Sequence, residues 1–335
     1  MDYSLGNEKS RKNIRTKQWV KDRIKKRLTK HFITKITKIV WVICRFFLMF
    51  GLGFVILFPL VEMISKTFMP VSEYTDISVQ YIPKFLTLNN IKRTIQYMNY
   101  WYALKESIIL SVSCAVLQII TAAVTGYGFA RFRFKLREPL FLLVILSIII
   151  PSQIMFLPNY IQYRFFDFFG IGKLLGHTVK LIDTRYSFWL PSAMGVGIRS
   201  GLFIYIFRQA FRNIPKELEE AAKIDGCGNW ITFIKVMVPN VKASIVTVFL
   251  FSIVWHWNEY ALTRTYFPSK HQPLAVALAV SVETAKQNMA THTDTLFQMS
   301  LSYSGALLFL IPPMLLYIFT QRLFVEGVET SGIKG

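Results

Sequence analysis

The sequence lacks the residue groupings that hold metals or form disulfide frameworks. Its three cysteines, Cys44, Cys114 and Cys227, are far apart, and two of them lie in apolar stretches, so no disulfide framework is implied. The five histidines show no metal-ligand spacing. We therefore expect neither a metal site nor a cofactor.

Nucleotide-binding and catalytic motifs are also missing. The nearest approach to a G-x-x-x-x-G-K-[ST] phosphate loop is FFGIGKLLG, which lacks the first glycine and the hydroxyl residue after the lysine. No nucleophile elbow, pair of carboxylates or cluster of His, Asp and Glu stands out. The sequence predicts that the chain is not an enzyme and does not itself bind ATP in a Walker site.

Charged residues are scarce, at 17% of the 335 residues, whereas 53% are hydrophobic. The apolar residues gather in blocks that reach the roughly 20 residues needed to span a bilayer. The six blocks are Ile39–Ile64, Ser107–Ala130, Leu140–Tyr160, Phe188–Phe211, Val241–Leu262 and Leu301–Phe324. The sequence therefore predicts an all-α, polytopic membrane protein with six transmembrane helices.

Lysine and arginine outnumber acidic residues by 39 to 19, and they concentrate in the first 38 residues and in the stretch ARFRFKLRE. Basic residues favour the cytoplasmic side of a membrane, which predicts that both termini are cytoplasmic. Membrane lipid explains the basic arm better than nucleic acid does, because the arm adjoins a span. The predicted organisation is a basic cytoplasmic arm (1–38), a first span (39–64), an extracellular segment (65–106), a five-helix core (107–324) and a cytoplasmic tail (325–335).

A polar stretch, KELEEAAKIDGCGNWITFIKVMVPN, lies between the fourth and fifth blocks in the loop 212–240. Its acidic residues suit the first turn of a helix, and Gly226 suits the stop at the other end. Leu218, Ala221, Ala222 and Asp225 share one face of this helix, where the alanines let another surface approach closely. Spacing alone leaves open whether that surface belongs to this chain or to another protein.

The stretch EAAKIDG, followed nine residues later by VMVP, resembles the EAA loop of ABC importer permeases, whose pattern is E-A-A-x-x-x-G-x(9)-I-x-L-P. In that family the loop forms a coupling helix that docks in a cleft of the cytoplasmic ATPase subunit. The resemblance implies an ATPase-coupling role for Glu220, Ala221, Ala222, Asp225 and Gly226.

Four more stretches, GYGFARFRFK, IIPSQIMFLPNY, WHWNEY and QPLAVALA, resemble the permeases of carbohydrate importers, similar to the MalG subunit of the maltose system. The resemblance covers roughly Ile36 to Gly335. The sequence departs from the family at Lys105–Glu106–Ser107, where Asn-Ser is usual, and in its long basic N-terminus.

The resemblance implies a type I ABC importer permease fold in a bacterial cell membrane, where the chain would form half of the translocation path for a sugar or oligosaccharide. The implied partners are a second homologous permease, two ATPase subunits and an extracellular solute-binding protein. An ion-coupled secondary transporter acting alone is the alternative. It would place buried acids at mid-membrane, and no span has an Asp or Glu near its centre.

Four residues are candidates for the translocation path: Pro151 and Gln153 in the third block, and Asn258 and Glu259 near the end of the fifth. Pro151 removes a backbone hydrogen bond and is expected to kink its helix, while polar groups within spans usually face a cavity. Helix packing is the alternative for Pro151. For the surroundings of Asn258 and Glu259 the alternative is an aromatic belt at the membrane surface.

Overall fold

The computed structural model describes residues 3–151, 154–167, 179–287 and 292–332. It describes side chains for residues 34–151, 154–167, 179–287 and 295–321. The chain divides into two compact units, Met1–Glu62 and Met63–Gly335. Gln153, one of the predicted path residues, lies outside the described residues.

The first unit is part of one helix, α1 (Tyr3–Phe68), whose last turns belong to the second unit. The segment Thr34–Phe68 is long and apolar enough to cross a membrane. Most of its side chains up to residue 62 are exposed, including large apolar ones such as Phe47 and Val55. Such a surface is unfavourable in water and stable among lipid chains.

The second unit is helical, and within the described ranges its only β pairing is an isolated bridge between Phe166 and Val179. Its helices are α2 (Asn89–Tyr97), α3 (Tyr100–Arg131), α4 (Arg137–Ile149), α5 (Phe156–Arg164), α7 (Tyr186–Ala193), α8 (Ser200–Asn213), α9 (Glu217–Ile224), α10 (Asn229–Thr232), α11 (Val238–Asn240), α12 (Lys242–Asn258), α13 (Ala261–Tyr266), α14 (Leu274–Gln287) and α15 (His292–Gly332). A 3₁₀ turn, η1 (Val71–Glu73), and a π-helical turn, η2 (Phe233–Met237), complete it. The predicted all-α fold is confirmed for the described residues.

Three of the described helices contain a segment that is long and apolar enough to cross a membrane: Thr34–Phe68 of α1, the whole of α3, and Thr295–Gln321 of α15. A fourth candidate is the pair Asn229–Asn240 and Lys242–Asn258, which is bent by 78°. The third and fourth predicted spans, at 140–160 and 188–211, are each divided between two helices.

Local backbone chemistry explains both interruptions. A proline disfavours helical geometry in the residue before it, and Ile150, which precedes Pro151, is extended with ψ 122°. Pro151 therefore follows the end of α4 rather than kinking a continuous helix. Between α7 and α8, Gly195 and Arg199 have φ angles of 75° and 57°, which an α-helix of L-residues does not include.

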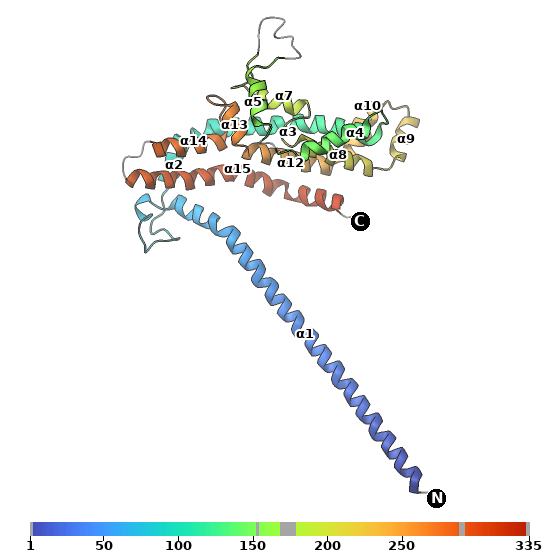
Figure 1. Cartoon of the computed structure of the whole chain (residues 1–335). Helices are drawn as coiled ribbons and strands as arrows, with labels where there is room; N and C mark the ends of the chain where they lie inside the picture. Colours follow the sequence, from blue (N-terminus) through green and yellow to red (C-terminus); the bar gives the residue numbers. More distant parts are fainter. Residues whose placement is uncertain (1–2, 152–153, 168–178, 288–291, 333–335) are drawn as a thin grey trace. The chain divides into compact units, whose positions relative to one another are not determined.

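Helix α3 is central to the second unit, and α7, α8, α12 and α14 pack against it (Figure 1). At Gly126, α3 approaches α8 so closely that an added Cβ would lie 2.7 Å from Cβ of Phe207 and 2.9 Å from the backbone nitrogen of Arg208. Only glycine permits this approach. Tyr127 and Phe211 belong to the same aromatic core, which holds the two helices together at this end.

The loop 212–240 and helix α2 of the predicted extracellular segment lie at opposite ends of the second unit (Figure 1). Helices α9 and α10 lie at the end where α3 finishes and α4 begins, and α2 and α14 lie at the other end (Figure 1). The basic residues that follow α3 therefore share an end with the loop 212–240, as a common cytoplasmic side requires. The cytoplasmic location of the termini stays a prediction.

A buried ionic cluster joins three segments at the opposite end. Glu106 of α3 accepts hydrogen bonds of 2.7 to 3.1 Å from the Arg185 guanidinium. Nδ1 of His271 lies 3.2 Å from Oε2 of the same carboxylate. Glu106 is one of the residues at which the sequence departs from the family pattern. Its carboxylate is therefore paired within this chain, with Arg185 and His271.

Candidate functional site

The predicted coupling helix is present as α9, with three glutamates in its first turn, where the helix dipole favours acids. Helix α9 ends at Ile224, and Gly226, two residues later, has a φ angle of 79°. The backbone N–H of Cys227 donates to the carbonyl of Ala222 at 2.9 Å. The expected stop at Gly226 is confirmed. An added Cβ at Gly226 would meet no atom within 4 Å, so the glycine is required by backbone geometry rather than by packing inside this chain.

A buried ion pair fastens α9 to the end of α3. Nε of Arg131 lies 3.4 Å from Oε1 of Glu219, and the two side chains are 7% and 12% exposed. A second guanidinium nitrogen of Arg131 donates to the backbone carbonyl of Ile214 at 2.5 Å. Arg131, one residue of the basic stretch ARFRFKLRE, therefore contacts both the first turn of α9 and the segment just before it.

The face predicted for α9 is divided in the structure. Ala222 is buried against this chain, whereas Leu218, Ala221 and Asp225 are exposed. Packing on this chain is therefore confirmed for Ala222 alone, and contact of the exposed residues with another protein stays a prediction. Ala222 gives the close approach to the bundle, and Ala221 leaves a small side chain on the open side.

Large apolar side chains surround the open side of α9. Ile224 is 86% exposed and Trp230 is 68% exposed, and Leu218 is also exposed. Exposed apolar residues grouped among polar ones mark an interaction surface. We call Leu218, Glu220, Ala221, Ile224, Asp225 and Trp230 the α9 surface.

The segment after α9 connects this surface to the helical bundle. Phe233 and Met237 of η2 are buried in the aromatic core that includes Phe207 and Phe211. The chain then turns by 78° into α12. Packed side chains therefore connect the segment after α9 to α8, and the chain continues into α12.

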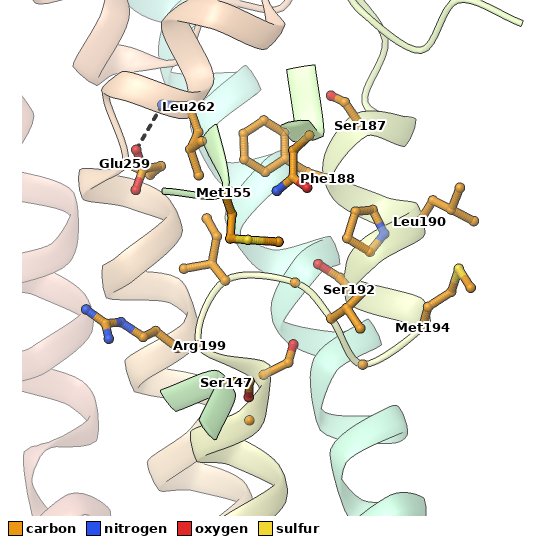
Figure 2. Close-up of a pocket in the computed structure, with 18 of the residues that line it drawn as sticks. Ser147, Met155, Ser187, Phe188, Leu190, Ser192, Met194, Arg199, Glu259 and Leu262 are labelled. Atoms are coloured by element: carbon orange, nitrogen blue, oxygen red, sulfur yellow. Dashed lines mark hydrogen bonds between the residues drawn. The ribbon is translucent and has the colours of Figure 1, made fainter. Parts of the chain in front are cut away.

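A cavity of about 560 Å³ lies farther along α12, lined by residues of α4, α5, α7, α8, α12 and α13. Ser147, Met155, Ser192 and Glu259 lie around it, and Oε1 of Glu259 accepts a hydrogen bond from the backbone N–H of Leu262 (Figure 2). Its volume is within the range of about 300–1,000 Å³ typical of sites for small molecules.

Of the predicted path residues, Glu259 lines this cavity, and Pro151 and Asn258 do not. Pro151 is exposed just after α4, and Asn258 is exposed and donates to the carbonyl of Val254 at 2.7 Å. Two contributors that sequence reasoning did not identify are His256 and Ser192. His256 sits inside WHWNEY, a stretch interpreted from its tryptophans and its Asn-Glu pair.

Among the described residues, no three His, Cys, Asp or Glu side chains lie together as the ligands of a metal ion would. The sequence also did not indicate that Arg131 and Glu219 form an ion pair. The sequence shows three glutamates within four residues, Glu217, Glu219 and Glu220, but it does not show which of them faces the bundle.

Comparisons of the sequence with a family model and with known proteins agree on one family. Residues 118–330 match the sequence model described as binding-protein-dependent transport system inner membrane component. The arabinooligosaccharides transport system permease protein AraQ of Halalkalibacterium halodurans is 27% identical over 287 residues, 85% of this chain and 93% of the relative. The maltodextrin transport system permease protein MdxG of Bacillus subtilis is 25% identical over 296 residues, 88% and 96% of the two chains.

The fold is also similar to that of a solved structure. A chain of a bacterial ABC transporter involved in the import of the acidic polysaccharide alginate superposes with a TM-score of 0.68 at 18% identity, with 85% of this chain and 96% of that chain covered.

Proposed function

Since the chain belongs to the family of binding-protein-dependent transport system inner membrane components, we propose that it is the permease subunit of a bacterial ABC importer for a sugar or oligosaccharide. The observation that carries the proposal is α9, a helix with the EAA pattern whose Glu220 and Ala221 are exposed at one end of the bundle. The relatives named as permeases for arabinooligosaccharides and maltodextrin support a carbohydrate.

The α9 surface is the proposed contact with the ATPase subunit. Glu220 offers a carboxylate for a charge-assisted hydrogen bond to a basic group of the partner, and Ile224 offers exposed apolar area. Ala221, Asp225 and Gly226 complete the proposed coupling site. ATP binding then favours one conformation of the bundle through contacts that differ between the two conformations.

Three connections carry the movement of α9 into the bundle. The Arg131–Glu219 pair reaches α3, the buried Phe233 of η2 reaches α8, and the bent chain continues into α12. Trp255, near the far end of α12, lines the cavity. Glu259, which follows the last residue of α12, also lines it. The same helix therefore adjoins both the ATPase contact and the proposed translocation path.

On the path, Glu259 is proposed to face the solute, and Asn258 beside it to lie at the outer mouth. Pro151 lies between α4 and α5, next to Ile150, which lines the cavity. The chain is a multi-pass membrane protein, and we place both termini in the cytoplasm because the basic stretches before the first span and after α3 favour that side. A second homologous permease would supply the other half of the path, with two ATPase subunits and an extracellular binding protein.

The test is reconstitution of the full complex in liposomes and a screen of saccharides for ATPase stimulation that depends on the binding protein. We expect one group of saccharides to stimulate hydrolysis and to be imported. Import by this chain alone, driven by a proton or sodium gradient without ATP, would instead support the secondary transporter.

A further inference from the structure

The segment between α1 and α2 carries large apolar side chains that are exposed and that belong neither to the cavity lining nor to the α9 surface. They are Tyr81, Ile82, Phe85, Leu86 and Leu88, with exposed fractions of 46%, 84%, 73%, 79% and 57%. Large apolar side chains exposed together mark a contact with another protein or with a membrane. We call residues 81–88 the apolar loop.

Polar contacts give this segment a defined fold. The backbone N–H of Lys84 donates to Oε2 of Glu73 at 3.0 Å, and the Lys84 ammonium lies 2.7 Å from Oδ2 of Asp76. Glu73 and Val79 are buried. The apolar side chains of the loop are therefore exposed although the chain around them is held in place.

Hydrogen bonds hold this segment at the end of α1, which it follows in the chain (Figure 1). The Ser65 hydroxyl donates to the carbonyl of Tyr81 in the apolar loop. Successive carbonyls at the end of α1 also accept hydrogen bonds from the segment, and they have no partner inside the helix. These bonds join the carbonyl of Lys66 to the Tyr74 hydroxyl at 2.5 Å, that of Thr67 to the Asn90 amide at 3.0 Å and that of Phe68 to the Thr87 N–H at 2.8 Å. The loop is therefore fixed at the level of the last turn of α1.

The last turn of α1 lies close to the edge of the membrane. The uncharged run Phe46–Val61, bounded by Arg45 and Glu62, is about 24 Å long at 1.5 Å per residue. This is less than the roughly 30 Å of the hydrocarbon core of a bilayer. Even where that core ends at Val61, Ser65 is about 6 Å farther along the helix, within a headgroup layer that is roughly 5–7 Å thick on each side. The hydrogen bond from Ser65 therefore places Tyr81 at the level of the headgroups.

Two observations favour lipid over a protein partner for the apolar loop. Its depth beside the last turn of α1 places it where headgroups and upper acyl chains lie. It also continues a surface that suits lipid, because Ile64 near the end of α1 is exposed like Val61 before it. We propose that the apolar loop inserts into the leaflet at this end of α1, with Ile82, Phe85 and Leu86 among the lipids. The proposal goes beyond the proposed function, because it gives part of the predicted extracellular segment a lipid partner.

The test measures the depth of the loop with a nitroxide spin label on a single cysteine, Phe85→Cys, in a variant whose three native cysteines are replaced by alanine. The protein is reconstituted in lipid nanodiscs with the subunits that co-purify with it. Collisions of the label with oxygen report lipid, and collisions with a soluble nickel chelate report water. We expect the Phe85→Cys label to collide more with oxygen than with the chelate, as a label at Val55→Cys on α1 should.

Gln96→Cys is the matched control in water. Gln96 is exposed on α2 and shares a face with the charged residues Lys92 and Arg93, which precede it by four and three positions. Charged side chains avoid lipid, so the label at Gln96→Cys should collide more with the chelate. Leu86→Cys repeats the measurement in the loop, so that misfolding of Phe85→Cys alone still leaves a result.

Reaction with a water-soluble maleimide gives a second readout, since nanodiscs leave both faces of the membrane open to the reagent. Phe85→Cys should react about tenfold more slowly than Gln96→Cys, because apolar surroundings disfavour the reactive thiolate. The two rates should become equal after unfolding in sodium dodecyl sulfate. Preferential collision with the nickel chelate at both loop positions would place the loop in water and overturn the proposal. Few collisions with either reagent would overturn it as well, because a second permease or another protein would then cover the loop.

Discussion

Arg131 and Glu219 form a charge pair, 3.4 Å apart from Nε to Oε1, where the end of α3 meets the first turn of α9. Arg131 belongs to the basic stretch ARFRFKLRE, which is predicted to lie on the cytoplasmic side. The pair shows that Arg131 also contacts the helix that carries the EAA pattern.

We expect Arg131→Ala and Glu219→Ala each to destabilise the complex by about 3–5 kcal/mol, because either change leaves a buried charge without its partner. The double variant should lose less than the sum of the two. Thermal unfolding in detergent measures both. Glu283→Ala, which breaks an exposed pair with Arg264 at 3.9 Å, is the control and should cost at most about 1 kcal/mol. Additive losses in the double variant would show that the two charges do not interact.

The contact between α3 and α8 predicts opposite outcomes for two neighbouring glycines. Gly126→Ala should destabilise the protein by about 1–3 kcal/mol, because its Cβ would overlap the α8 backbone at Arg208. Gly128→Ala should be neutral or stabilising, since its Cβ meets no atom within 4 Å and alanine favours helix. Equal unfolding temperatures for the two variants would contradict the proposed close approach.

The ionic cluster at the other end predicts that Glu106→Gln lowers stability by about 3 kcal/mol or more, because Arg185 loses a carboxylate that accepts three hydrogen bonds. Replacing both Glu106 and Arg185 by glutamine should recover part of that loss. The measurement is the unfolding temperature of each variant. A double variant less stable than Glu106→Gln would contradict the pairing.

The carboxyl group of Asp76 predicts a dependence of stability on pH in the segment 65–106, which is predicted to be extracellular. Hydrogen bonds from Lys84 and Ser78 lower the pKa of its carboxyl from 3.8 to about 2. A lowered pKa means that the stabilisation is complete above the unfolded value and is lost as the pH falls from 3.8 through about 2. The difference in unfolding temperature between the natural protein and Asp76→Asn should be constant from neutral pH to about pH 5 and shrink below that. A difference that first disappears near neutral pH would exclude Asp76 as its source.

The sequence was sufficient for the features that depend on local chemistry. Long apolar blocks predicted membrane helices, and α1, α3 and α15 contain them. The spacing EAAKIDG predicted a short helix ended by a glycine, and Gly226 has the positive φ that such an end requires. Each of these follows from residues adjacent in the chain.

Features that depend on tertiary packing were less predictable. Pro151 was expected to kink a helix, yet the helix ends before it. The loop at Gly195 divides the fourth block, which the sequence had predicted as a single span. Helical spacing placed Ala221 and Ala222 on one face, but only the neighbouring helices decide that Ala222 is buried. His256 was not identified because a single histidine on an apolar helix gives no signal until its neighbours are known.

The most direct test of the central claim, that α9 couples this permease to an ATPase, compares Gly226→Asp with Gly228→Asp. Both glycines have open space around the position of a Cβ, but only Gly226 has a positive φ, so aspartate costs about 1–2 kcal/mol of strain at Gly226 alone. Glu220→Lys, which reverses an exposed charge of the α9 surface, is the second variant.

The measurement is co-purification of the ATPase with each variant, together with saccharide uptake by cells. We predict that Gly226→Asp and Glu220→Lys abolish most uptake and retain less ATPase, while the permease itself stays folded, and that Gly228→Asp behaves like the natural protein. Normal uptake and normal ATPase retention in both Gly226→Asp and Glu220→Lys would contradict the account.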